Sequence, residues 1–143
     1  MNDTLIKFGY PKTVIKSYKH WSVLLRPQQI TLGSLILGAH SEAIAFGELS
    51  DEIMTELPIV IKNIEQTLSC CFNYDKLNYL MLMMVDPHVH FHVLPRYSSL
   101  REFGTLTAED FAWPGPPDLS LAMEMEDSSK QELFEYLRIN WKA

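Results

Sequence analysis

The chain has 143 residues and a mass of 16.5 kDa, and 47% of its residues are hydrophobic, so it can form one domain with an apolar core. This size and composition exclude a disordered tail and argue against two independent domains. The net charge of -6 argues against a general nucleic-acid binder, which would be basic, and we expect no nucleic-acid partner.

Two short apolar runs in the first third of the chain predict a pair of strands. They cover residues 22–25 and 34–37. The connector between them contains Pro27 and Gly33, which are typical of turns. We therefore expect a strand, an irregular connector and a second strand.

A long amphipathic helix is predicted to begin after Ser50, which is a suitable N-cap. Apolar residues recur there at spacings of three and four, as on one face of a helix. They are Ile53, Leu57, Val60, Ile61, Ile64, Leu68 and Phe72. Because proline lacks a backbone donor, Pro58 should kink this helix or delay its start.

Residues 78–85 and 88–94 are rich in apolar side chains and predict two strands joined by a tight turn. Asp86 and Pro87 stand between them, and this pair does not suit the two-residue turns that need positive φ. Either the loop is wider or Pro87 is cis.

After Pro95 the sequence is irregular, and the prolines of segment 113–117 exclude a helix or a central strand there. Ser128 or Ser129 then caps a C-terminal helix. The adjacent Cys70 and Cys71 offer no disulfide framework, and no window approaches the roughly 18 apolar residues of a membrane span. We expect a cytoplasmic protein with no membrane partner.

Three of the five histidines alternate with apolar residues over positions 88–93. On a strand this alternation places His88, His90 and His92 on one face and the apolar residues in the core. Neighbouring imidazoles would stand about 6.6 Å apart and the outer two about 13 Å apart. Decoration of a half-exposed strand is a less favoured interpretation, because such positions favour β-branched or aromatic residues.

Two chemistries suit this arrangement. A His-x-His pair can chelate a metal, but a third ligand, such as Asp86, His20 or His40, must then come from elsewhere. Alternatively, the central imidazole attacks a phosphorus atom to form a phosphoramidate, while its neighbours orient it and contact the phosphate.

Residues His88–Leu94 fit the His-φ-His-φ-His-φ-φ signature of the histidine-triad family, and Pro95-Arg96 follows as in its dinucleoside polyphosphate hydrolase branch. The resemblance spans about residues 20–97. It implies an α+β fold, with an antiparallel sheet on which a long helix packs. We therefore predict one histidine-triad-like domain over residues 1–143, in which residues 98–143 form an irregular loop and a C-terminal helix.

The resemblance implies a nucleotidyl hydrolase or transferase that binds a nucleotide substrate and needs no cofactor. Such enzymes cleave at the α-phosphate of dinucleoside polyphosphates, such as diadenosine polyphosphates, or of nucleoside phosphoramidates, through a nucleotidyl-histidine intermediate. By position, His90 matches the nucleophile, and His88 and His92 match the residues that flank it. The resemblance also implies a homodimer, and we predict no metal-ligating residues.

The sequence departs from the family pattern at three places. Arg26 stands where many members carry an asparagine for the ribose, and Ser34 stands where many carry a histidine. Residues 83–87 replace a glycine-rich loop that helps to bind phosphate. Arg26, Gln28 and Arg96 are therefore candidate nucleotide contacts. The alternatives are a nucleotide-binding module with little turnover, or a metalloprotein that uses a His-x-His pair.

Overall fold

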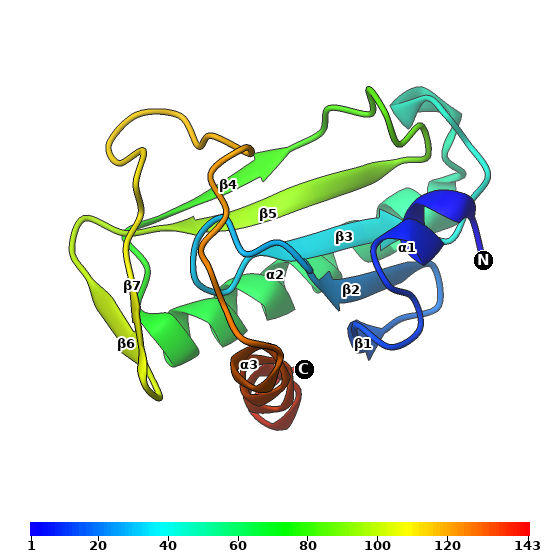
Figure 1. Ribbon diagram of the computed structural model, residues 1–143. Coiled ribbons are helices and arrows are strands. Elements are labelled where there is room, and N and C mark those ends of the chain that lie inside the picture. Colours follow the sequence, from blue (N-terminus) through cyan, green and yellow to red (C-terminus); the bar gives the residue numbers. More distant parts are fainter.

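The computed structural model describes residues 1–143, and its centre is a five-stranded antiparallel sheet in the order β1-β2-β3-β5-β4 (Figure 1). Both strands predicted before the helix are present, as β2 and β3. The five strands are β1 (Val14–Ser17), β2 (Trp21–Leu25), β3 (Leu35–Ala39), β4 (Lys76–Leu80) and β5 (His90–Arg96).

The predicted long helix is α2 (Asp51–Phe72), which lies behind the sheet in Figure 1. The Ser50 side chain accepts a hydrogen bond from the Ile53 N–H, as expected of an N-cap. The helix begins at Asp51, so the prediction that Pro58 delays its start is wrong. Pro58 lies on the exposed side, where water can reach the carbonyl that loses its partner.

The main core lies between α2, the C-terminal helix α3 (Asp127–Ile139) and one face of the sheet. The predicted stripe of α2 is buried there, apart from the partly buried Ile61. Helix α3 contributes Leu133 and Leu137, and it begins after Glu126 rather than at the predicted serine cap. None of the helices has the length and apolar character needed to span a bilayer.

The predicted tight hairpin between the last two sheet strands is wrong. Strand β4 ends at Leu80 and β5 begins at His90, so residues 81–89 form a wide loop. The alternative of a wider loop is confirmed, and the cis bonds precede Pro11 and Pro114 rather than Pro87. Met83 supplies positive φ in this loop, which a proline cannot adopt.

One end of the opposite face of the sheet is covered by α1 (Asp3–Lys7), which has no counterpart among the predicted elements. Figure 1 shows α1 in front of the sheet and α2 behind it. Leu5 of α1 forms a small second core with Leu24 and Ile36. A helix this short has no full apolar repeat from which it could be recognised.

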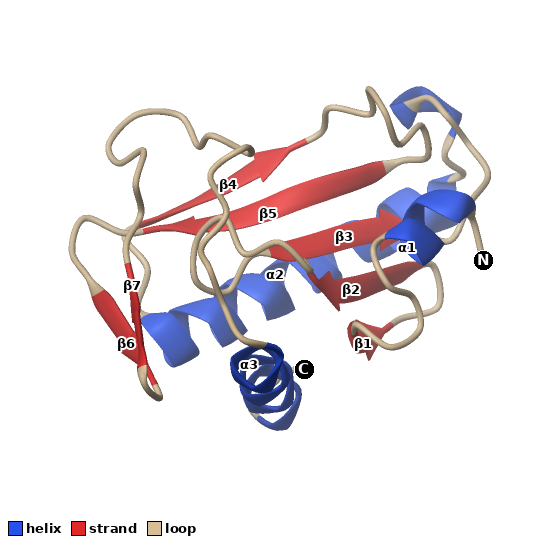
Figure 2. Cartoon of the chain, viewed as in Figure 1, coloured by secondary structure: helices blue, strands red, loops and turns tan.

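The remaining elements are short. The one-turn helix η1 (Phe46–Glu48) precedes α2, and β6 (Arg101–Phe103) pairs with β7 (Leu106–Ala108). Figure 2 shows that a long loop then leads from β7 to α3. As predicted, the proline-rich segment 113–117 is neither helix nor strand.

Candidate active site

His90 and His92 lie side by side on the face of β5 that is turned away from α2. Their ring centroids are 5.2 Å apart, and their exposed fractions are 1% and 6%. His90 lies opposite Gly38 of β3, and His92 lies opposite Ile36. Two of the three predicted histidines therefore share one face of a strand, whereas His88 precedes the strand in the loop.

The His90 imidazole has a defined tautomer. Its Nδ1 lies 2.7 Å from the carbonyl oxygen of His88, and a carbonyl only accepts, so Nδ1 carries the hydrogen. The lone pair is then on Nε2, which has no hydrogen-bond partner in the protein. No fully buried polar side-chain atom lacks a partner, so Nε2 keeps some contact with solvent. This is the tautomer that a nucleophilic histidine requires.

His88 is held by residues from distant parts of the chain. Its Nδ1 lies 2.8 Å from the Thr4 hydroxyl, and its backbone N–H donates to the same oxygen at 3.3 Å. Its Nε2 lies 3.2 Å from a carboxylate oxygen of Glu42. These contacts hold His88 in place, and the backbone carbonyl of His88 orients the His90 ring. Thr4 and Glu42 could not be predicted as partners of His88, because nothing in the local sequence pattern links them to it.

His92 is a neutral hydrogen-bond donor. Burial, followed by the positive charge of Arg26, lowers the pKa of His92 from 6.5 to about 4. Arg26 Nε donates to His92 Nδ1 at 3.3 Å, so the hydrogen of the neutral ring is on Nε2. That N–H can donate to an anionic oxygen placed beside the two rings.

Arg26, a predicted nucleotide contact, is buried beside His92. Burial lowers the pKa of this arginine. Nη1 donates to the backbone carbonyl of Gln28 at 2.6 Å, whereas Nη2 has no protein partner. Because no fully buried polar atom lacks a partner, Nη2 remains accessible. The Gln28 side chain is exposed, and its backbone carbonyl holds the Arg26 guanidinium.

The connector between β2 and β3 is shaped by Gln29, which the sequence analysis did not single out. Its buried amide nitrogen donates to the carbonyls of Arg26 and Ser34, and its oxygen accepts from the N–H groups of Gly33 and Ser34. Gly33 has φ of +86°, which favours glycine. Gln29 therefore fixes the backbone from which Arg26 extends.

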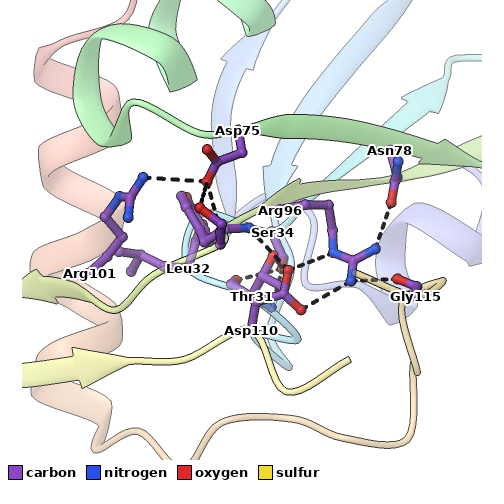
Figure 3. Close-up of polar contacts among 11 residues, drawn as sticks. Thr31, Leu32, Ser34, Asp75, Asn78, Arg96, Arg101, Asp110 and Gly115 are labelled. Carbon is purple, nitrogen blue, oxygen red and sulfur yellow. Dashed lines mark hydrogen bonds and ion pairs between the residues drawn. The ribbon is translucent and has the colours of Figure 1, made fainter. Parts of the chain in front are cut away.

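Arg96, the third candidate nucleotide contact, is occupied by protein partners (Figure 3). Nε and Nη2 donate to the two carboxylate oxygens of Asp110 at 2.7 and 3.1 Å. Nη1 donates to Asn78, and Nη2 also donates to the carbonyl of Gly115. With an exposed fraction of 3%, Arg96 ties the long loop to the sheet. These contacts favour a structural role over the predicted nucleotide contact.

A cavity of about 800 Å³ lies beside β4 and is bounded by the segment Trp113–Pro117, but it does not include the histidines. No group of three His, Cys, Asp or Glu side chains is arranged to hold a metal ion. The third ligand that the metal hypothesis needs is therefore not brought to the histidine pair.

No family model matches the chain, and no curated protein matches it. Several solved structures, in contrast, match the chain. A histidine triad protein from Bradyrhizobium japonicum has a TM-score of 0.76 at 19% identity and covers 99% of this chain and 97% of its own. A histidine triad protein from Sinorhizobium meliloti has a TM-score of 0.75 at 18% identity, and the match covers 98% of this chain and 95% of that protein. One from Marinobacter aquaeolei has a TM-score of 0.72 at 21% identity, with coverage of 90% and 87%. The chain therefore has the α+β fold of histidine-triad proteins, as the sequence predicts.

Proposed function

We propose that this protein is a member of the histidine-triad family and a nucleotidyl hydrolase or transferase. Its substrates are dinucleoside polyphosphates or nucleoside phosphoramidates, which it cleaves at the α-phosphate. The observation that carries the proposal is the His90 ring, whose Nδ1–H is held by the His88 carbonyl while Nε2 keeps its lone pair. The shared fold supports the same conclusion.

In the first step, His90 Nε2 attacks the α-phosphorus. The N–P bond forms as the bond from phosphorus to the leaving group breaks, and the leaving group takes the electron pair. A departing polyphosphate leaves as an anion, and a departing amine takes a proton from water. The His88 carbonyl, which accepts from Nδ1–H, stabilises the positive charge that the ring gains.

In the second step, water attacks the phosphorus of nucleotidyl-His90. The electron pair of the N–P bond returns to Nε2, the water loses a proton to solvent, and a nucleoside monophosphate is released. The Nε2–H of His92 and the free Nη2 of Arg26 donate to phosphate oxygens in both steps. These two donors take over the phosphate contacts of the glycine-rich loop, whose place in the sequence is occupied by residues 83–87 without a glycine.

A nucleotide-binding module with little turnover is the second candidate. Two observations favour it: the loop before β5 contains no glycine, and the exposed fraction of His90 is only 1%. Such a module binds nucleotides at the same residues without forming a covalent intermediate.

Release of nucleoside monophosphate by wild type and His90→Ala separates these candidates. The substrates are a diadenosine polyphosphate, an adenosine phosphoramidate and an adenylated lysine analogue. We expect release from at least one of them by the wild type, and none by the variant. Binding of nucleotide by the wild type without any release would overturn the enzyme proposal in favour of the binding module. The homodimer and the cytoplasmic location remain part of the proposal.

A further inference from the structure

The N-terminal segment of residues 2–8, called the cover below, lies directly on the histidine pair. The Phe8 ring centroid is 5.7 Å from that of His90 and 5.9 Å from that of His92. Leu5 is 1% exposed and packs over Gly38, the residue opposite His90. A contact with solvent as small as that of His90 admits water, but it does not admit a phosphoryl group with its nucleoside.

Polar contacts attach the cover to the segment that carries the histidines. The Thr4 hydroxyl is hydrogen-bonded to Nδ1 of His88, and Lys7 Nζ lies 2.7 Å from a carboxylate oxygen of Asp86. At the start of the cover, the Asn2 amide donates to the carbonyls of Ala39 and Ser41. The cover is therefore attached to Asp86 and to His88, and the carbonyl of His88 orients the nucleophile.

Several features allow the cover to detach. A helix of five residues is not stable without its packing, and solvent screens the Lys7–Asp86 ion pair on its lysine side. Lys7 is half exposed, and Ile6 faces solvent. Gly9 follows the cover with φ of +98°, and a residue without Cβ can change φ at low cost. Gly9 is therefore the candidate hinge, and opening there breaks the hydrogen bonds from the Tyr10 N–H to the Leu5 carbonyl and from the Thr13 hydroxyl to the Phe8 carbonyl.

We propose that the cover is a hinged gate, which must swing away from β3 and β5 before a substrate phosphate can reach His90 Nε2. This inference rests on the proposed function. The structure is then the closed state, and turnover is proportional to the fraction of molecules that are open.

A reversible disulfide can lock the gate. A Cβ built on Gly38 would lie 3.1 Å from Leu5 Cγ. The sulfur of a cysteine at residue 5 would take a position close to that Cγ, so that cysteines at the two positions can form a disulfide. The variant Leu5→Cys/Gly38→Cys is therefore made in a Cys70→Ser/Cys71→Ser background, and the background alone is the matched control. Both native cysteines lie on α2, behind the sheet.

Two readouts are compared between the oxidised and the reduced lock. One is carbethoxylation of His90 by diethyl pyrocarbonate, mapped by mass spectrometry, with His20 beside α2 as the internal control. The other is release of nucleoside monophosphate. We expect both to fall by about tenfold or more on oxidation and to recover on reduction, because only open molecules react. Unchanged His90 modification and unchanged turnover in the oxidised lock would overturn the gate.

The two readouts separate the gate from the proposed function. If no form of the protein turns over any substrate, the proposed function fails, while the difference in His90 modification still decides the gate.

A second pair of variants does not depend on disulfide formation. Lys7→Gln removes the ion pair and should speed His90 modification by about two- to fivefold, whereas Lys12→Gln, at an exposed position, should not. Equal rates in these two variants would contradict the gate.

Discussion

At the residue scale, the buried His92 makes stability depend on pH. The pKa of its ring falls from 6.5 in the unfolded chain to about 4 in the folded site. Between these values the unfolded chain binds a proton that the folded site does not, so the free energy of unfolding decreases as the pH falls through this window. Above this pH window, His92 is neutral in both the folded and the unfolded state and adds no pH dependence to the stability.

Urea unfolding at several pH values, for wild type and His92→Asn, measures this effect. The wild type should lose more stability than the variant as the pH falls from about 6.5 to about 4, because the variant has no ring to protonate. Parallel losses in the two proteins would show that His92 is not held neutral.

Arg26 offers a direct test of phosphate recognition. Arg26→Ala removes the free Nη2, and the loss of a hydrogen bond to a charged group costs about 1.5–3 kcal/mol. We therefore expect nucleoside monophosphate to bind roughly ten- to a hundredfold more weakly, as measured by titration calorimetry. The matched control is Gln28→Ala, which keeps the carbonyl that holds Arg26 and should bind nearly as the wild type does. Unchanged affinity in Arg26→Ala would exclude its role as a phosphate contact.

The alternation of histidine with apolar residues was sufficient to place His90 and His92 on one face of a strand. It could not reveal that His88 lies in the loop, because the end of a strand depends on pairing with β3 and β4. Nor could it reveal Thr4, since residue 4 meets residue 88 only through the fold. Polar contacts between residues that are far apart in the chain leave no periodic signal in the sequence.

At the element scale, the ion pair between Arg96 and Asp110 fastens the long loop to β5. Asp110→Asn leaves a buried guanidinium without its counter-charge, and breaking such a pair costs about 3–5 kcal/mol. Chemical denaturation should show this loss, while Glu109→Gln, at the exposed neighbouring position, should change stability by less than about 0.5 kcal/mol. Similar small effects in both variants would mean that the pair does not stabilise the fold.

The elements that were predicted correctly are those with a long or clear pattern. Helix α2 has an apolar stripe that runs from Ile53 to Phe72, and β2 and β3 are apolar runs bounded by turn residues. The elements that were missed are short: α1, β1, β6 and β7 are each held by tertiary contacts rather than by their own periodicity. The loop 81–89 was misjudged because its methionines resemble a continued strand.

At the scale of the whole molecule, β4 is an edge strand of the sheet, and its outer side has no partner within the chain. An unpaired edge favours association with another strand. The proposed homodimer predicts a mass of twice 16.5 kDa in size-exclusion chromatography with light scattering. A single species of 16.5 kDa at all protein concentrations would contradict the dimer.

The fold as a whole could be predicted from a motif of seven residues and a coarse pattern of strands and helices, and the solved structures confirm it. The function does not follow from the fold, because one fold supports many activities. The proposed function depends on His90 and on the residues that hold its tautomer, and the proposed gate adds movement of the cover.

Detection of the covalent intermediate tests the proposed role of His90 most directly. Wild type and His90→Ala are mixed with a dinucleoside polyphosphate, quenched in base, which preserves phosphoramidates, and digested for peptide mapping. We predict a nucleotidyl group on His90 of the wild type that disappears as monophosphate is released, and none in the variant. Release of monophosphate without any modification of His90, or with modification of another residue, would contradict the account.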